Sequence, residues 1–219
     1  GESDFTYTKA GSGILKVGTI VTNDGDADRI GVVSIGSGAY TMGDNATAIG
    51  HTAKAAATSV GVGANASVTA TEATAIGNDT RAEGLRAIAL GSNCKALGQL
   101  SVAIGYNCTA SASTSIAIGY QAAATEQRSI VMGDSSSDNG NGYSTAIGYY
   151  SNSNGSNGTA LGSATWAAEC STAVGSSAKA YGDYSVVIGH DIRTAANSGL
   201  VIGAGIDNSI LSGQFNDTA

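Results

Sequence analysis

Aliphatic residues recur along the chain in a fixed pattern. From residue 35 onward, thirteen dipeptides of an aliphatic residue or Met followed by Gly form a regular series, at spacings of 14 residues with two of 13 and one of 15. A fixed period of this length indicates a repeat architecture in which each repeat is one structural unit. The dipeptides are Ile35-Gly36, Ile49-Gly50, Val62-Gly63, Ile76-Gly77, Leu90-Gly91, Ile104-Gly105, Ile118-Gly119, Met132-Gly133, Ile147-Gly148, Leu161-Gly162, Val174-Gly175, Ile188-Gly189 and Ile202-Gly203.

The residue three places before each of these glycines is nearly always β-branched. This column and the apolar residue just before the glycine alternate with small residues such as Ala103 and Gly105. Such a period-2 alternation predicts a short strand in every repeat. The column holds Val33, Thr47, Val60, Thr74, Ile88, Val102, Ile116, Ile130, Thr145, Thr159, Thr172, Val186 and Leu200.

A second, smaller alternation follows three and five residues after the glycine and predicts a second strand. Seven residues after the glycine, another Gly often appears, where we expect a turn with positive φ. The alternating pairs include Ala53 and Ala55, Ala66 and Val68, Cys94 and Ala96, Cys108 and Ala110, Ala122 and Ala124, and Ala178 and Ala180; the second glycines are Gly43, Gly84, Gly98, Gly155 and Gly182.

Two strands and two turns in 14 residues predict one coil of a flattened β-solenoid. Helix competes poorly, because each interior Gly costs a helix about 1 kcal/mol. Coils stack about 4.8 Å apart, so twelve steps predict a rod of roughly 58 Å with a narrow interior suited to Ala, Ser and Gly. Both faces of the main strand are apolar or small. We therefore expect a flat Ala/Gly face that is buried against other copies, most simply in a cyclic trimer.

The composition fits this architecture. The 219 residues include 37 Ala, 32 Gly, 12 aromatic residues and no Pro, and only 12% are charged. This charged share is about half the usual one, which argues against a disordered chain. Collagen is excluded because Gly does not recur every third residue and Pro is absent.

Charge and hydropathy narrow the range of partners. The net charge of −7 and only ten scattered Lys and Arg residues argue against nucleic-acid binding. No apolar run approaches the ~18 residues of a membrane span and no leader opens the chain, so we expect no membrane insertion within this segment. The chain begins at Gly1 and not at Met, so we expect it to be a piece of a longer protein.

Three segments carry a family resemblance: residues 87–91 (AIALG), 101–105 (SVAIG) and 115–119 (SIAIG). They resemble the SVAIG-type repeat of YadA-like head domains in trimeric autotransporter adhesins. The resemblance covers residues 32–205 and leaves residues 1–31 as an N-terminal cap or junction and residues 206–219 as a closing segment. It implies an all-β, left-handed parallel β-roll, assembled as a homotrimer on the bacterial cell surface and adhering to a cell-surface glycan or protein.

The same repeats also occur in trimeric phage tail fibres. Residues 208–216 look like the segment that ends fibre heads followed by a self-cleaving chaperone. The alternative is therefore a structural stalk segment of a phage tail fibre on the virion, or of a surface fibre, whose recognition is done by an adjoining tip.

Candidate catalytic residues do not converge. His51 and His190 are ten coils apart, about 48 Å along the rod, and so do not share an active site. Acidic residues are similarly spread over many coils, with no paired carboxylates. We therefore expect no enzymatic activity, no cofactor and no metal; the acidic residues considered are Glu72, Glu83, Glu126 and Glu169.

Four aromatic residues are candidate ligand-binding residues. Tyr106, Tyr120 and Tyr149 share the column directly after the glycine, with Asp134 between the last two. We expect this column to lie at an exposed turn. An aromatic ladder there suits contact with a saccharide or a protein, and the alternative is that the rings shield the coil edge. Trp166 lies in a 13-residue step and either packs over a defect in the stack, which we favour, or is a binding anchor.

Two further features have alternative interpretations. Residues 134–142, in the 15-residue step, are rich in oxygen ligands, and we expect a polar bulge there, with a calcium site as the alternative. Cys94 and Cys108 share a column, so their Cα atoms are expected near 4.8 Å, within disulfide range. Stacked side chains point the same way, however, so we expect free thiols in small core positions. Three cysteines without a CxxC also argue against a disulfide framework or a zinc site.

Overall fold

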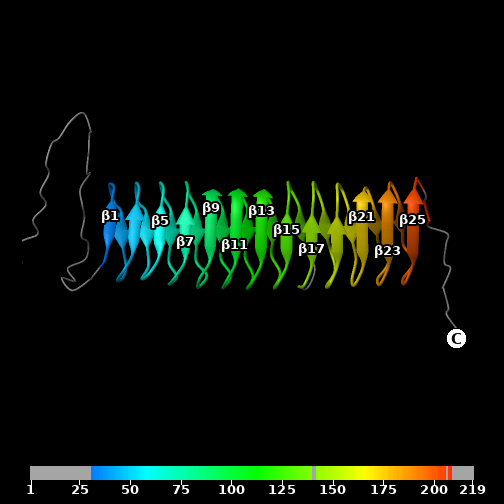
Figure 1. The fold of residues 1–219 in the computed structure, drawn as a ribbon, viewed down its shortest axis with the longest axis horizontal. Coiled ribbons are helices and arrows are strands. Elements are labelled where there is room, and N and C mark those ends of the chain that lie inside the picture. Colours follow the sequence, from blue (N-terminus) through cyan, green and yellow to red (C-terminus); the bar gives the residue numbers. More distant parts are fainter. Residues whose placement is uncertain (1–30, 140–141, 206, 209–219) are drawn as a thin grey trace, which may run out of the picture.

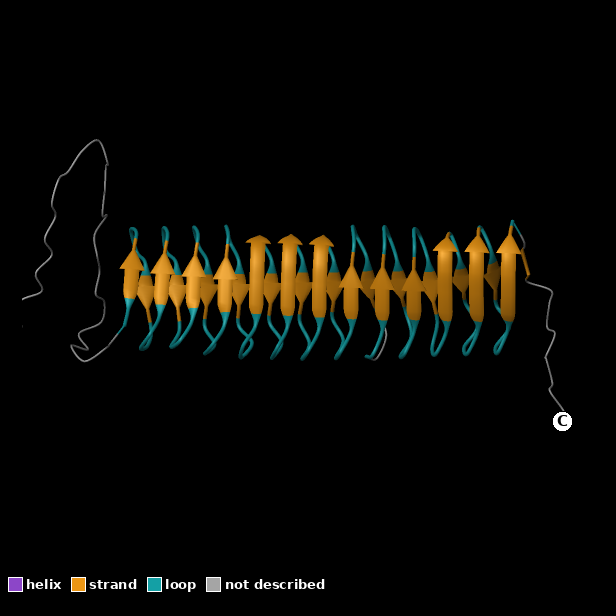
Figure 2. Ribbon diagram, viewed as in Figure 1, coloured by secondary structure: helices purple, strands orange, loops and turns teal. Residues whose placement is uncertain are grey.

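The chain winds as a parallel β-solenoid whose coils follow one another along a single axis (Figure 1). The computed structural model describes residues 31–139, 142–205 and 207–208. Each coil contributes one strand to each of two 13-stranded parallel sheets. The described residues form strands, turns and loops without a helix (Figure 2). The predicted all-β solenoid is therefore confirmed, and none of the described residues belongs to a helix that could cross a membrane.

Sheet 1 contains the odd-numbered strands, which have the β-branched columns. Its register follows the repeat, since Val102 lies opposite Ile116 and Ile104 opposite Ile118. The strands are β1 (Val33–Ile35), β3 (Thr47–Ile49), β5 (Val60–Val62), β7 (Thr74–Ile76), β9 (Ile88–Ser92), β11 (Val102–Tyr106), β13 (Ile116–Tyr120), β15 (Ile130–Met132), β17 (Thr145–Ile147), β19 (Thr159–Leu161), β21 (Thr172–Ser176), β23 (Val186–His190) and β25 (Leu200–Ala204).

Sheet 2 contains the even-numbered strands, each of two residues. They are β2 (Tyr40–Thr41), β4 (Lys54–Ala55), β6 (Ser67–Val68), β8 (Arg81–Ala82), β10 (Lys95–Ala96), β12 (Thr109–Ala110), β14 (Ala123–Ala124), β16 (Ser137–Asp138), β18 (Asn152–Ser153), β20 (Trp166–Ala167), β22 (Lys179–Ala180), β24 (Arg193–Thr194) and β26 (Asp207–Asn208). β26 carries sheet 2 into the segment predicted to close the chain, whereas the rest of that segment and residues 1–30 lie outside the described residues.

The interior between the sheets is lined by small side chains, as predicted. Alternate residues of a strand point to opposite faces, and the second residue of each sheet 1 strand points inward. Ala103 and Ala117 are fully buried there, and only a few larger residues fit, such as Val131 and Ile192. Burial of such small residues gives each coil little hydrophobic stabilisation on its own, at roughly 25 cal/mol per Å².

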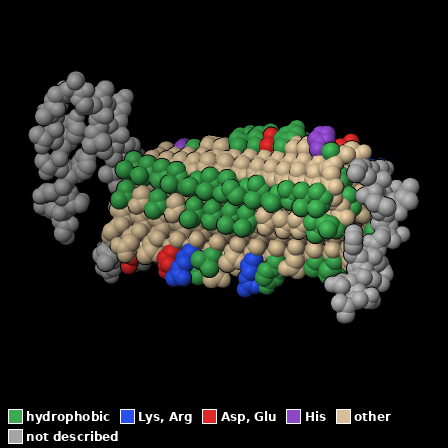
Figure 3. Space-filling model, turned by 45° about the vertical axis from the view of Figure 1, so that its right-hand side comes forward, with side chains coloured by type: hydrophobic (Ala, Val, Ile, Leu, Met, Phe, Trp, Pro, Cys, Tyr) green, Lys and Arg blue, Asp and Glu red, His purple; other side chains and the backbone are tan. Residues whose placement is uncertain are grey.

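The outer face of sheet 1 differs from the expected flat Ala/Gly face. Because the narrow interior takes the small residues, the aliphatic columns on either side of them point outward. Figure 3 shows hydrophobic side chains in a band along the roll, with charged side chains on its two edges. The most exposed members are Val33, Ile35, Ile76, Ile88, Ile130, Met132, Ile147, Ile188, Leu200 and Ile202. The expectation of an outer Ala/Gly face was therefore wrong.

The turns also differ from the prediction. Positive φ angles occur at the glycine that ends each aliphatic-Gly dipeptide, as at Gly105 (133°), and not at the second glycines such as Gly84. In the second turn, which follows each sheet 2 strand, the positive φ falls two residues after the second glycine, as at Arg86 (58°). A Cβ on Gly84 would instead collide with the backbone of Gly98 in the next coil. The second glycines therefore allow close approach between coils.

Candidate functional site

The tyrosine column lies at the first turn, where sheet 1 strands end. Tyr106 ends β11 and Tyr120 ends β13, in direct register. Their rings stack with centroids 5.4 Å apart and planes 6° apart. The side chains are 53% and 48% exposed. The predicted exposed ladder is therefore present over these two coils and offers a flat apolar surface with two hydroxyl groups.

The ladder does not continue to Tyr149. Asp134, which is exposed, occupies the intervening coil and its carboxylate accepts a hydrogen bond from the Ser135 hydroxyl at 2.6 Å. Tyr149 instead packs edge-on against Tyr150, with ring centroids 4.5 Å apart. The two exposed aromatic pairs are thus separate features of the same edge.

The two histidines occupy the same column and are both exposed. His51 follows β3 and His190 ends β23, so ten coil steps separate them. Neither belongs to a metal-binding group, since the described residues include no cluster of three or more His, Cys, Asp or Glu side chains.

Trp166 lies on a different surface from the tyrosine column. It begins β20, and its half-buried side chain is on the outer face of sheet 2. Its ring centroid is 4.9 Å from that of Tyr181, which is exposed. The structure therefore groups Trp166 with Tyr181 and does not bring it together with Tyr106, Tyr120 and Tyr149.

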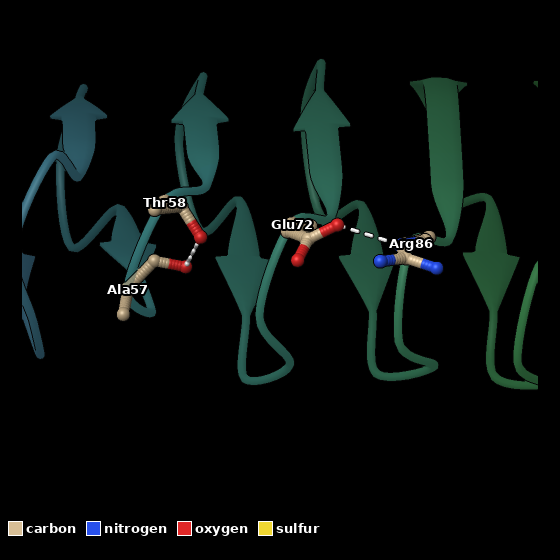
Figure 4. A network of polar contacts seen from close by, with 4 residues as sticks. All are labelled: Ala57, Thr58, Glu72 and Arg86. Atoms are coloured by element: carbon tan, nitrogen blue, oxygen red, sulfur yellow. Dashed lines mark hydrogen bonds and ion pairs between the residues drawn. The ribbon is translucent and has the colours of Figure 1, made fainter.

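Cationic side chains at the second turn pair with neighbours in the adjacent coil. The Arg86 guanidinium donates a hydrogen bond to the Glu72 carboxylate at 2.6 Å, from exposed positions (Figure 4). This hydrogen bond, and then the charge of Arg86, lower the pKa of Glu72. Arg128 similarly lies over the ring of Tyr143, 5.2 Å from its centroid. These pairs connect the second turns of neighbouring coils.

The 15-residue step contains a buried carboxylate. Asp138 is fully buried in β16 and accepts hydrogen bonds from the backbone N–H groups of Thr125, at 2.6 Å, and Glu126, at 3.1 Å. Ser137 lies opposite Ala123 with the usual offset, whereas Asn152 lies opposite Ser137 with one extra residue. The extra residue therefore follows Asp138. Residues 140–141 of the predicted bulge lie outside the described residues.

Cys94 and Cys108 form a disulfide, so the expectation of free thiols was wrong. Both side chains are fully buried in successive coils, with Cα atoms 4.7 Å apart. Coil stacking holds the two Cα atoms at a separation that a disulfide can span. The bond therefore forms although stacked side chains point the same way. Cys170 is free and half-buried.

The repeated coil geometry has a counterpart among known families. The family model described as YadA head domain repeat (2 copies) matches residues 33–53, 43–59, 56–80, 69–93, 82–107, 96–122, 110–136, 142–165 and 171–191. These matches cover well over half of the chain.

The chain belongs to the YadA head repeat family.

This assignment confirms the resemblance drawn from the SVAIG-type segments. A comparison with curated proteins found no match. As a YadA head repeat protein, the chain is expected to use its outer surfaces, because the interior is filled by side chains such as Ala103 and Ala117.

One surface feature of this YadA head repeat protein was missed from the sequence. Seven of its ten Lys and Arg residues lie in the described ranges, and five of these seven share the outward position of sheet 2. They are Lys54, Arg81, Lys95, Lys179 and Arg193. The expectation of scattered charges was thus wrong, and sorting them by position within the 14-residue repeat would have revealed the column.

Proposed function

We propose that the chain assembles as a homotrimer through the outer face of sheet 1 and that the trimer is an extracellular adhesive head. In this proposal the roll is left-handed, as the family likeness implies, and lies on the bacterial surface. It holds a cell-surface glycan or protein without performing a reaction on it.

The observation that carries the proposal is the aliphatic band of sheet 1. Burying one Ile, Val or Leu side chain completely is worth about 1.5–3 kcal/mol, and this face leaves many of them partly exposed from Val33 to Ile202. Soluble monomers rarely expose continuous apolar patches larger than a few hundred Å². A cyclic assembly covers one such band on every copy without leaving an open end.

Two further features support an adhesive head outside the cell. The disulfide between Cys94 and Cys108 fits an oxidising compartment. Three parallel rolls would also present each exposed surface, including the stacked rings of Tyr106 and Tyr120, three times. Repetition of this kind allows weak single contacts to add up to firm attachment.

The trimer is tested by light scattering on the purified chain. We expect a mass about three times the 21.4 kDa of one chain, and a mass of one chain would contradict the proposal. Adhesion is tested by applying the trimer to glycan arrays and to whole cells. A trimer that binds neither would instead be a stalk segment whose fibre recognises its target through an adjoining tip.

A further inference from the structure

Charged residues are separated by position within the coil. The five cationic residues of the sheet 2 column project from strands, whereas eight acidic residues lie in the turns. Two acidic residues accompany the column in the described ranges: Glu83, which pairs with Arg81, and Asp207, which lies opposite Arg193 in the register. The turn residues are Asp44, Glu72, Asp79, Glu126, Asp134, Glu169, Asp183 and Asp191. A chain of net charge −7 therefore carries a positive row on one face.

The row consists of two groups, one toward each end of the roll. Arg81 lies opposite Lys95 in the register, with Lys54 two coils before Arg81. Lys179 lies opposite Arg193. The positions between the groups, from Thr109 to Asn152, carry no charge in this column, and neighbouring positions are about 4.8 Å apart.

Like charges directly opposite each other on one face destabilise a sheet. Both groups contain such a pair, Arg81 with Lys95 and Lys179 with Arg193. Each of the four side chains is exposed or half-buried. Asp207 follows Arg193 in the same register, and an anionic ligand lying along the row would offset the repulsion within the two cationic pairs.

Aromatic side chains lie beside the second group. Trp166 is the register neighbour of Lys179, and Tyr181 follows Lys179 by two residues on the same side of the sheet. The Trp166 and Tyr181 rings are in contact, with centroids 4.9 Å apart. An aromatic surface next to cations suits a sugar ring that carries an acidic group, since the ring packs on the aromatic face and the anion on the cation.

We propose that the outer face of sheet 2 binds a linear acidic polysaccharide, with Lys179, Arg193, Trp166 and Tyr181 as the principal contacts and Lys54, Arg81 and Lys95 as a second set. This inference rests on the proposed adhesive function and names its ligand. An extended polysaccharide with carboxylate or sulfate groups at regular intervals matches a straight row of cations in charge and in shape. Sheet 1 is the face assigned to trimer contact, so this face stays accessible in the trimer.

The test measures binding of the full chain to heparin, to hyaluronan and to uncharged dextran at several salt concentrations. We expect binding to at least one acidic polymer, weakening as salt rises, and no binding to dextran. Heparin alone would indicate sulfate recognition, and binding to both would indicate that carboxylates suffice. Absence of binding to both acidic polymers at low salt would overturn the inference.

Matched variants locate the surface. Lys179→Gln with Arg193→Gln should weaken binding at least tenfold, and Trp166→Ala should weaken it severalfold. Arg86→Gln with Arg128→Gln removes the same charge from the second turn and should change affinity less than twofold. Equal losses in the two charge variants would mean unspecific attraction and would refute the site. Lys54→Gln with Lys95→Gln provides an independent measurement if the first pair disturbs folding.

Adhesion assays separate this inference from the proposed function. A trimer that adheres equally well to cells before and after enzymatic removal of their acidic polysaccharides would refute the ligand and leave adhesion standing. A trimer that binds heparin through the row but adheres to no cell would refute the adhesive function alone.

Discussion

Cys94 and Cys108 are joined by a disulfide inside the roll, one coil apart. Both side chains occupy a column that elsewhere holds residues such as Ala53 and Ala122, and both are fully buried. The bond links two coils that are otherwise held by backbone ladders and small side chains. It therefore adds a covalent link between two coils whose small interior side chains contribute little to stability.

Removing this disulfide should lower stability without changing the fold. Replacing both Cys94 and Cys108 by Ala keeps small residues in the column, and the loss of a bond closing a loop of 14 residues costs about 3 kcal/mol. Chemical unfolding with and without reductant measures this cost, and the double variant should not respond to reductant. Alkylation of the unfolded, unreduced protein should modify Cys170 alone; three modified cysteines would contradict the disulfide.

Charges placed on the aliphatic face should prevent assembly. Ile104→Asp with Ile118→Asp puts two carboxylates on adjacent strands at the proposed trimer contact, where they would lose water without gaining a partner. Light scattering should then give the mass of one chain. Thr109→Asp with Ala123→Asp places the same charges in the same coils on sheet 2 and should leave the trimer intact. A trimer that survives the first pair would contradict this contact.

The repeat made most of the fold predictable. An aliphatic-Gly dipeptide every 14 residues, as at Ile104-Gly105, gave the coil, and alternation around Ala103 gave the strand. The direction of that alternation was harder to predict, because both Ala103 and Ile104 are apolar. Only the width of the interior decides that Ala103 points inward and Ile104 outward.

Details of the turns and pairings could not be predicted for a different reason. Stacking gives every coil nearly the same backbone, so residues that rarely adopt positive φ do so here, including Thr58 at 52° and Leu100 at 56°. Local preference is overridden by the neighbouring coil. The contact between Trp166 and Tyr181 likewise arises from coil stacking, which brings together residues separated along the chain.

Gly105 should tolerate no side chain. Its φ of 133° is unfavourable for other residues, and a Cβ there would collide with the carbonyl oxygen of Gly119 in the next coil. Gly105→Ala should therefore cost about 3 kcal/mol or more, combining backbone strain with displacement of the neighbouring coil. Gly205→Ala is a matched control, since its φ is also positive but no atom lies near the added Cβ, and it should cost only about 1–2 kcal/mol. Denaturant midpoints measure both, and equal costs would contradict the collision.

Asp138 should be needed for the stability of the 15-residue step. Asp138→Ala leaves the N–H groups of Thr125 and Glu126 without their acceptors, which costs about 1–3 kcal/mol for a buried group. Asp138→Asn keeps one acceptor oxygen and should lose less. Hydrogen exchange of the Thr125 and Glu126 amides provides a local measurement, and unchanged protection in Asp138→Ala would show that the carboxylate is dispensable.

Variants of Tyr106 and Tyr120 should show whether their stacked rings bind a ligand or shield the coil edge. If they contact a ligand, Tyr106→Ala with Tyr120→Ala should weaken attachment of the trimer to cells about tenfold, the effect of losing roughly 1.4 kcal/mol of binding free energy. Tyr143→Ala with Tyr184→Ala removes two exposed rings from the second turn and is the matched control. Attachment and denaturant midpoint are measured on both variants. A lower denaturant midpoint with unchanged attachment would mean that the Tyr106 and Tyr120 rings shield the coil edge. The contact between the two rings, whose centroids are 5.4 Å apart, would then stabilise the roll and would not bind a ligand.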